Sequence, residues 1–128
     1  MLNSILKELK RSCNLLGVIF AYRDGRVISE DIDEQFDIKK FTAMCASVLE
    51  SAISLGQTIS DRKINKIITE LENKTIFIFK CDDKTFLTLI IGNESKIGSN
   101  FNQIDDYIQK IIDEYESPLL KRKKVEQD

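Results

Sequence analysis

Apolar residues recur at steps of three and four in three segments, the pattern of helices that bury one face. In the first segment, Leu2 to Cys13, charged residues separate the apolar ones, and Asn14 is a suitable left-handed stop. The second opens at Asp37, whose side chain can cap the first turn. The third is expected to end before Pro118, the only proline. The predicted helices span residues 2–13, 37–58, and 95 or 99 to 117.

Short runs rich in β-branched and aromatic residues lie between these helices and predict five strands. The first two strands are joined by Asp24-Gly25, a dipeptide typical of tight hairpin turns, and the polar residues 30–35 are expected to form a loop. Apolar residues occupy successive positions, as at Phe77 and Ile78, so helices are expected to cover both faces of the sheet. The predicted strands span residues 16–22, 27–29, 64–70, 75–80 and 85–91.

The second helix is nearly free of charge, since Glu50 is the only charged residue between Phe41 and Ser60. Two apolar stripes run along it. We expect one to pack on the sheet and the other to meet the same helix of a second copy, because charges are depleted at the cores of protein interfaces. The stripe expected on the sheet consists of Phe41, Met44, Cys45, Val48, Ala52 and Leu55. The stripe expected at the contact between copies consists of Thr42, Ala46, Leu49 and Ile53.

Composition narrows the possible functions. With 128 residues, the chain has the size of one domain. Nineteen basic and 21 acidic residues give a net charge of −2, too weak a field to favour nucleic acid as a partner. The chain has no histidine, which excludes Ser-His-Asp catalysis, Cys-His catalysis and histidine-containing zinc sites.

The three cysteines lie far apart in the chain and form no Cys-x-x-Cys pair, which indicates a reducing cytosol and a cytoplasmic protein. Cys13 and Cys45 lie on apolar helix stripes and are expected to be buried and inert. Cys81 lies at a predicted turn and is expected to be exposed.

No group of residues forms a complete catalytic or cofactor-binding motif. The loop from Gly92 to Ser99 precedes a helix, as a phosphate-binding loop does, but five residues separate its glycines and no Lys-Ser or Lys-Thr follows the second one. The acidic run 30–34 lacks the glycine and the final glutamate of an EF-hand loop and is expected to be solvated. We therefore expect a protein that is not an enzyme and has no cofactor or metal.

The last residues differ in composition from the rest. A basic run at 121–124 suggests contact with anionic lipid or nucleic acid, but the acidic residues that follow it favour a solvated tail. We expect one domain at residues 1–117, a charged tail at 118–128, and no membrane contact through that tail.

The ordered set of elements resembles the roadblock family, which includes the dynein light-chain roadblock proteins and their archaeal and bacterial relatives. The resemblance covers residues 2–115. It rests on the first helix leading into Leu16-Gly17-Val18, the hairpin 23–28, the low-charge second helix, the meander, and Gly98 before the last helix. It implies an α+β fold, an α/β sandwich in the order α-β-β-α-β-β-β-α. Its five-stranded antiparallel sheet has the second helix on one face and the first and third helices on the other.

The resemblance also implies a dimer in which the second helices pair and the third strands join edge to edge. The interface residues expected for this dimer are Thr42, Ala43, Ala46, Leu49, Glu50, Ile53, Ile64, Lys66 and Ile68. The partner is expected to be a second copy of the chain or a roadblock paralogue.

In function, the resemblance implies a non-catalytic scaffold or regulator, as the members of this family are. Many bind Ras-like small GTPases and influence their nucleotide cycle, and the eukaryotic light chains bind dynein intermediate chains. We therefore expect a dimeric scaffold or regulator that binds a Ras-like small GTPase. The alternatives are a small-molecule-binding sensor and a profilin-like or longin-like adaptor.

Overall fold

The computed structural model describes residues 1–61, 63–92 and 101–127, with three helices and five strands in the predicted order. The loop compared above with a phosphate-binding loop falls in residues 93–100 after Gly92, outside the described residues, as do the predicted starts of the last helix. The elements are α1 (Leu2–Ser12), β1 (Gly17–Tyr22), β2 (Val27–Ile32), α2 (Ile38–Thr58), β3 (Ile67–Glu70), β4 (Lys74–Lys80), β5 (Thr85–Gly92) and α3 (Phe101–Gln127).

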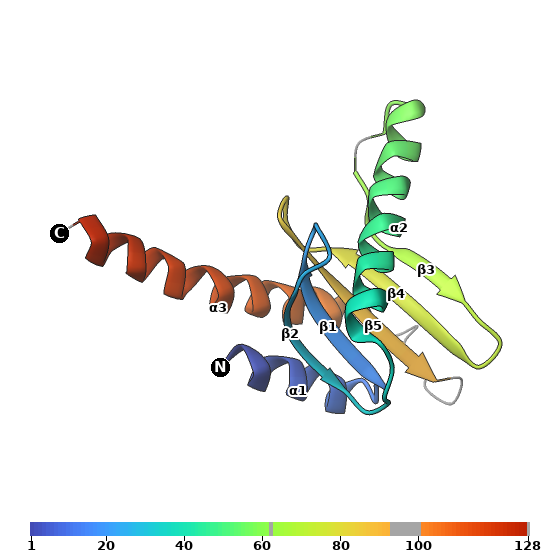
Figure 1. The fold of residues 1–128 in the computed structure, drawn as a ribbon, viewed down its shortest axis with the longest axis horizontal. Helices are drawn as coiled ribbons and strands as arrows, with labels where there is room; N and C mark the ends of the chain where they lie inside the picture. The colour runs from blue at the N-terminus through green and yellow to red at the C-terminus, as the bar shows by residue number, and fades with distance from the viewer. Residues whose placement is uncertain (62, 93–100, 128) are drawn as a thin grey trace.

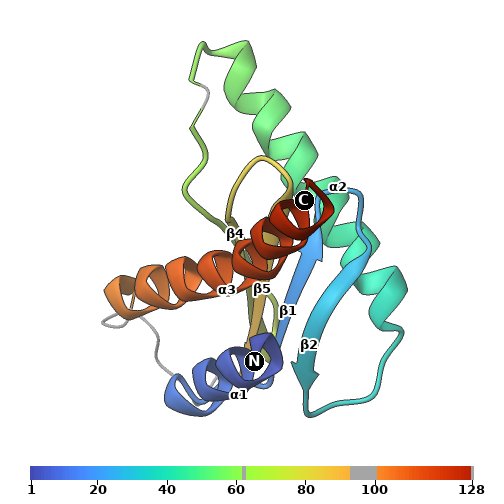
Figure 2. The same cartoon turned by 90° about the vertical axis from the view of Figure 1, so that its left-hand side faces the viewer.

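The five strands form one antiparallel sheet in the spatial order β2-β1-β5-β4-β3. α1 and α3 lie on one face of this sheet and α2 lies on the other (Figures 1 and 2). The predicted α+β sandwich is therefore confirmed. The spatial order leaves β2 and β3 as the two edge strands.

Each face of the sheet has its own apolar core, because successive residues of a strand point to opposite faces. The larger core lies under α1 and α3, and its fully buried residues include Leu6, Leu9, Phe20, Leu89, Ile104 and Ile111. The smaller core lies under α2 and consists of Ile19, Ala21, Cys45, Ala46, Leu49, Ile78 and Phe86. The expectation that helices cover both faces is confirmed.

Local signals set the helix ends as the sequence predicts. Asn14 ends α1 with a φ of 54°, in the left-handed region that asparagine tolerates well. Asp37 caps α2 by accepting a hydrogen bond from the backbone N–H of Lys40 at 3.1 Å. The rings of Phe36 and Phe41 lie 5.2 Å apart and form a hydrophobic staple over this cap.

The end of α3 differs from the prediction, because the helix continues past Pro118 to Gln127. A proline inside a helix removes one backbone hydrogen bond, which is why the sequence suggested a stop. The residues after it are nearly all strong helix formers, leucine, lysine, arginine, glutamate and glutamine, and their propensity favours continuation. In Figure 1 this last part of α3 runs away from the sheet. The predicted division between a domain and a tail at residue 117 stays a prediction.

Tyr115 fixes α3 to the end of the sheet. Its ring lies edge-on to Phe20 at 5.6 Å and to Tyr22 at 6.3 Å, and its hydroxyl donates to the Tyr22 hydroxyl at 3.3 Å. This hydrogen bond, with partial burial, raises the pKa of Tyr115 to about 12. The phenol therefore stays protonated at neutral pH.

Two edge strands differ in length from the prediction. β2 continues to Ile32, which pairs with Gly17, although residues 30–35 were expected to form a loop. The acidic residues can lie in a strand here because β2 is an edge, where charged side chains reach solvent. β3 begins at Ile67 rather than Ile64, and residues 63–66 before it are not part of a strand.

The orientation of α2 also differs from the prediction. Of the stripe expected on the sheet, Cys45 is buried and Phe41 packs against the smaller core, as predicted, but Met44, Val48 and Leu55 are exposed. The stripe expected between copies faces the sheet as well. Of that stripe, Thr42, Ala46 and Leu49 are buried, and Ile53 packs at the edge of the smaller core. Both stripes are apolar, so periodicity could not rank them, and the small side chains of Thr42 and Ala46 let the helix approach the sheet closely.

One buried hydroxyl weakens the contact between α2 and the sheet. Thr42 is 1% exposed, and its Oγ1 has no hydrogen-bond partner among the described residues. We expect Thr42→Val to raise the free energy of unfolding by about 1 kcal/mol, because valine has the same shape without the cost of burying an unpaired hydroxyl. Urea denaturation measures the change. Thr85→Val is the matched control and should lower stability, because the buried Thr85 hydroxyl donates to Asp82 at 2.8 Å.

Candidate interaction surfaces

The outward side of α2 presents a line of exposed apolar residues, which we call the α2 seam. Its members and their exposed fractions are Met44 at 61%, Val48 at 42%, Leu55 at 70% and Ile59 at 76%. They follow one another at four, seven and four residues, so they lie along one side of the helix. No charged residue falls between the first and last members except Glu50. Such a continuous apolar surface is typical of a contact with another protein.

The second half of α2 receives little cover from the sheet. Leu49 is the last buried residue of the helix, and in Figure 1 the C-terminal part of α2 projects past the ends of the strands. Leu55 near the end of α2 and Ile59 just after it are both exposed. A partner on the α2 seam would therefore cover side chains that the protomer itself leaves in water.

The single acid of α2 is balanced within the protomer. Arg23 Nε donates to Glu50 Oε1 at 2.8 Å, and Arg23 Nη1 donates to the backbone carbonyl of Asp83 at 3.2 Å. Arg23 thus joins α2 to the ends of two hairpins. Because Glu50 is paired with Arg23, it leaves no unpaired carboxylate beside the α2 seam.

A second exposed apolar surface lies at the β3 edge of the sheet. Ile68 is 46% exposed and Leu71, just after β3, is 53% exposed. β3 has a hydrogen-bonded neighbour, β4, on one side only. A free edge with apolar side chains can pair with a strand from another chain.

The structure divides the nine predicted interface residues into three groups. Ala43, Glu50, Lys66 and Ile68 are exposed. Ile53 and Ile64 are half-buried at the margin of the smaller core. Thr42, Ala46 and Leu49 are buried between α2 and the sheet, so their side chains are not available to a partner. The exposed apolar residues on the other side of the same helix are Met44, Val48, Leu55 and Ile59.

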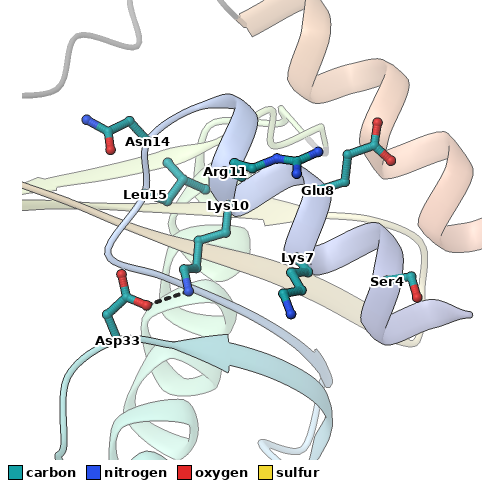
Figure 3. Close-up of a pocket in the computed structure, with 8 residues that line it drawn as sticks. All are labelled: Ser4, Lys7, Glu8, Lys10, Arg11, Asn14, Leu15 and Asp33. Carbon is teal, nitrogen blue, oxygen red and sulfur yellow. Dashed lines mark hydrogen bonds and ion pairs between the residues drawn. The ribbon is translucent and has the colours of Figure 1, made fainter.

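A polar groove runs along the outer side of α1, with a volume of about 580 Å³ (Figure 3). It is lined by Ser4, Lys7, Glu8, Lys10, Arg11, Asn14, Leu15 and Asp33. Lys10 Nζ lies 3.0 Å from Asp31 Oδ1 and also contacts Asp33, which ties α1 to the end of β2. Hydrogen bonds to Asp33 and Asp31 raise the pKa of Lys10, so this link is ionic at neutral pH. The sequence alone gave no sign of a groove here.

Burial makes all three cysteine thiols less reactive than an exposed one. Burial raises the pKa of the Cys45 thiol to about 11 and also raises the pKa of the Cys13 thiol, as expected for inert side chains. Cys81, expected to be exposed, is half-buried, and burial with the nearby Asp82 raises the pKa of its thiol. Within the described part of the chain, no three cysteine, aspartate or glutamate side chains gather as metal ligands.

None of the described helices is both long enough and apolar enough to cross a bilayer.

Residues 1–91 match the family model described as the Roadblock/LC7 domain. A comparison with curated protein sequences finds no match. Among solved structures, the chain is similar to Myxococcus xanthus MglB, with a TM-score of 0.83 and 16% identity over 91% of this chain and 95% of that one.

Two further solved structures have the same layout. A Roadblock/LC7 domain from Streptomyces avermitilis gives a TM-score of 0.81 at 14% identity, over 90% of this chain and 98% of that one. The gliding protein MglB from Thermus thermophilus gives 0.77 at 12% identity, over 88% and 89%. At such identities the structural likeness establishes the fold, and the family model carries the assignment.

Proposed function

Because the chain belongs to the Roadblock/LC7 domain family, we propose that it is a dimeric, non-catalytic regulator that binds a Ras-like small GTPase. Roadblock/LC7 domains are generally regulators without catalytic activity of their own, and the MglB-like neighbours fit a family of small-GTPase regulators. The observation that carries the proposal is the α2 seam, an exposed line of apolar side chains on the outward side of α2.

The dimer contact of this proposal is formed by the α2 seams of two copies. Apolar surface removed from water stabilises such a contact by roughly 25 cal/mol per Å². A two-fold axis brings the same surface of each copy together, so a seam without charge can face itself without repulsion. The proposed contact residues are Ala43, Met44, Val48, Leu55 and Ile59, with Glu50 at the margin and Lys66 and Ile68 at the β3 edge.

The regulator acts by binding one nucleotide state of the GTPase more tightly than the other. A binding protein shifts a two-state equilibrium only by the difference of its two affinities, and it needs no catalytic group to do so. We place this action in the cytoplasm, because all three cysteines of the chain are free thiols.

Calorimetric titration against Ras-like GTPases of the same cell tests the proposal. Each GTPase is loaded with GDP or with a slowly hydrolysed GTP analogue. We expect binding to at least one GTPase, with different affinities for its two nucleotide states. The protein alone should neither bind nor hydrolyse GTP, which is the matched blank. Equal affinities would leave a scaffold without a regulatory effect, and no binding to any Ras-like GTPase would overturn the proposal.

The groove on α1 supports one alternative, a small-molecule sensor. It offers several polar groups, but it is open and lies on the outside of a helix, whereas small-molecule sites generally enclose most of their ligand. Failure of every GTPase to bind, together with a ligand that protects the Lys7 and Lys10 amines from acetylation, would favour the sensor over the regulator.

A further inference from the structure

A stripe of hydrogen-bond donors runs along the outward side of α1, and we call it the α1 donor stripe. It consists of Ser4, Lys7 and Arg11, which follow one another at three and four residues and therefore lie on one side of the helix. All three side chains are exposed and line the polar groove of Figure 3. At a rise of 1.5 Å per residue, the stripe is about 10 Å long.

The two cations of this stripe have no counter-charge within the protomer. Neither Lys7 nor Arg11 forms an ion pair or a side-chain hydrogen bond with another described residue. They are four residues apart, where the Cβ atoms of a helix are about 5–6 Å apart and like charges destabilise it. A helix that carries two such charges offers a place for an anion from outside the chain.

The acids beside the stripe are already engaged within the protomer. Glu8 accepts a hydrogen bond from the Tyr107 hydroxyl of α3 at 3.2 Å. Asp33 forms an ion pair with Lys10, and Figure 3 shows Lys10 extending toward it. Around the helix, at about 100° per residue, the two cations of the stripe lie between Lys10 and Glu8. The acids thus border the stripe without neutralising it.

The number of unpaired cations decides which kind of anion fits. Recognition of anionic lipid uses clusters of roughly four to eight lysine or arginine residues. DNA-binding surfaces commonly make about six to ten phosphate contacts. Two cations bordered by two acids provide much less, and the acids repel a broad anionic surface. A narrow segment that carries two carboxylates fits between them.

We propose that the α1 donor stripe binds an acidic segment of a partner protein, in which two carboxylates lie one helical turn apart. One carboxylate pairs with Lys7 and the other with Arg11, and an oxygen of the segment accepts a hydrogen bond from the Ser4 hydroxyl. Two glutamates at positions i and i+4 of a helix provide this spacing, because it is the spacing of the two cations themselves. The groove is open, which suits a segment of a larger chain better than a small molecule.

This site is separate from the surface of the proposed dimer. α1 and α2 lie on opposite faces of the sheet, so a segment on the α1 donor stripe leaves the α2 seam uncovered (Figures 1 and 2). The proposal therefore does not rest on dimerisation or on GTPase binding.

Titration with a designed helical peptide tests the site. The probe carries two glutamates four residues apart on a helix that is otherwise made of alanine and glutamine, and in the blank peptide glutamines replace both glutamates. Amide NMR spectra of the isotope-labelled full chain show which residues the peptide contacts. We expect saturable shifts at α1 with the glutamate peptide and none with the blank. The shifts should weaken in high salt, since exposed charges are screened.

Charge removal on the stripe should weaken this binding. We expect Lys7→Gln/Arg11→Gln to raise the dissociation constant of the glutamate peptide at least about fourfold, because an exposed ion pair contributes roughly a factor of two to five. Glutamine favours a helix nearly as well as lysine and arginine do, so α1 should keep its structure. Lys39→Gln/Lys63→Gln removes the same charge at exposed positions elsewhere and should bind the peptide as the wild type does.

Charge reversal makes the test specific for these two positions. Lys7→Glu/Arg11→Glu should lose the glutamate peptide and bind a peptide with lysines in place of the two glutamates. Equal binding by the Lys7→Gln/Arg11→Gln and Lys39→Gln/Lys63→Gln proteins would overturn the site, as would shifts outside α1 and its neighbours or no shift at millimolar peptide.

Two further measurements separate the alternatives. Vesicles containing phosphatidylserine and a short DNA duplex are titrated in parallel, and tighter binding of either one that Lys7→Gln/Arg11→Gln abolishes would overturn the protein segment as the occupant. Val48→Asp, on the opposite face of the sheet, should bind the glutamate peptide as the wild type does. Failure of this site and failure of the proposed dimer are therefore distinguishable.

Discussion

Replacing Val48 with aspartate is expected to turn the proposed dimer into a folded monomer. Val48 lies in the middle of the α2 seam and is 42% exposed in the protomer, so the single chain tolerates a charge there. Within the dimer, the carboxylate would be buried without a partner. Such a charge costs about 3 kcal/mol, or roughly a hundredfold in the dissociation constant. Light scattering coupled to size-exclusion chromatography gives the mass directly.

Ala46→Asp is the contrasting variant on the same helix. Ala46 is 5% exposed and faces the smaller core, so a carboxylate there has no access to water. We expect this variant to lose the fold as well as the dimer, whereas Val48→Asp keeps the circular dichroism spectrum of the wild type. A Val48→Asp protein that remains a dimer at every concentration would contradict the assignment of the α2 seam.

Features encoded by a few neighbouring residues could be predicted from the sequence. The Asp37 cap, the Asn14 stop and the Asp24-Gly25 hairpin each depend on side chains within a few positions of one another. The layers could be predicted as well, because strands that are apolar on both faces need cover on both faces. These signals do not depend on how distant parts of the chain meet.

Which side of α2 faces the sheet could not be predicted, because both of its stripes are apolar. Which stripe packs on the sheet depends on how closely the helix can approach, and Thr42 and Ala46 allow a close approach where Met44 would not. The same uncertainty placed Thr42, Ala46 and Leu49 at the contact between copies. When a helix has apolar residues on two sides, the periodicity of its sequence does not show which side packs on the protein core.

Long-range polar contacts were equally hidden in the sequence. Arg23 and Glu50 come from different elements, as do Lys10 and Asp31, and nothing in their local sequence links them. The backbone directions at Ile68 follow from the β4 register, which only the folded sheet fixes.

Gly25 is expected to be a backbone position where even a small substitution is costly. Its φ is 98°, in the region that residues with a side chain rarely adopt. A Cβ built there would lie 3.0 Å from the backbone Cα of Ala43, on the first half of α2. Gly25→Ala therefore combines backbone strain with a clash against a helix that cannot move without disturbing the smaller core.

We expect Gly25→Ala to lower the free energy of unfolding by about 3 kcal/mol, since strain of this kind costs roughly 1–3 kcal/mol before the clash is added. For a chain of this size, that corresponds to a fall of roughly 10 °C in Tm. Gly92→Ala is the matched control, because its Cβ would meet Leu16 at an ordinary 3.5 Å. If both variants melt within a degree or two of the wild type, the close contact between the hairpin turn and α2 that the structure indicates is contradicted. A fall confined to Gly25→Ala, accompanied by weaker dimerisation, would show that the turn holds α2 in the position from which its seam meets the partner.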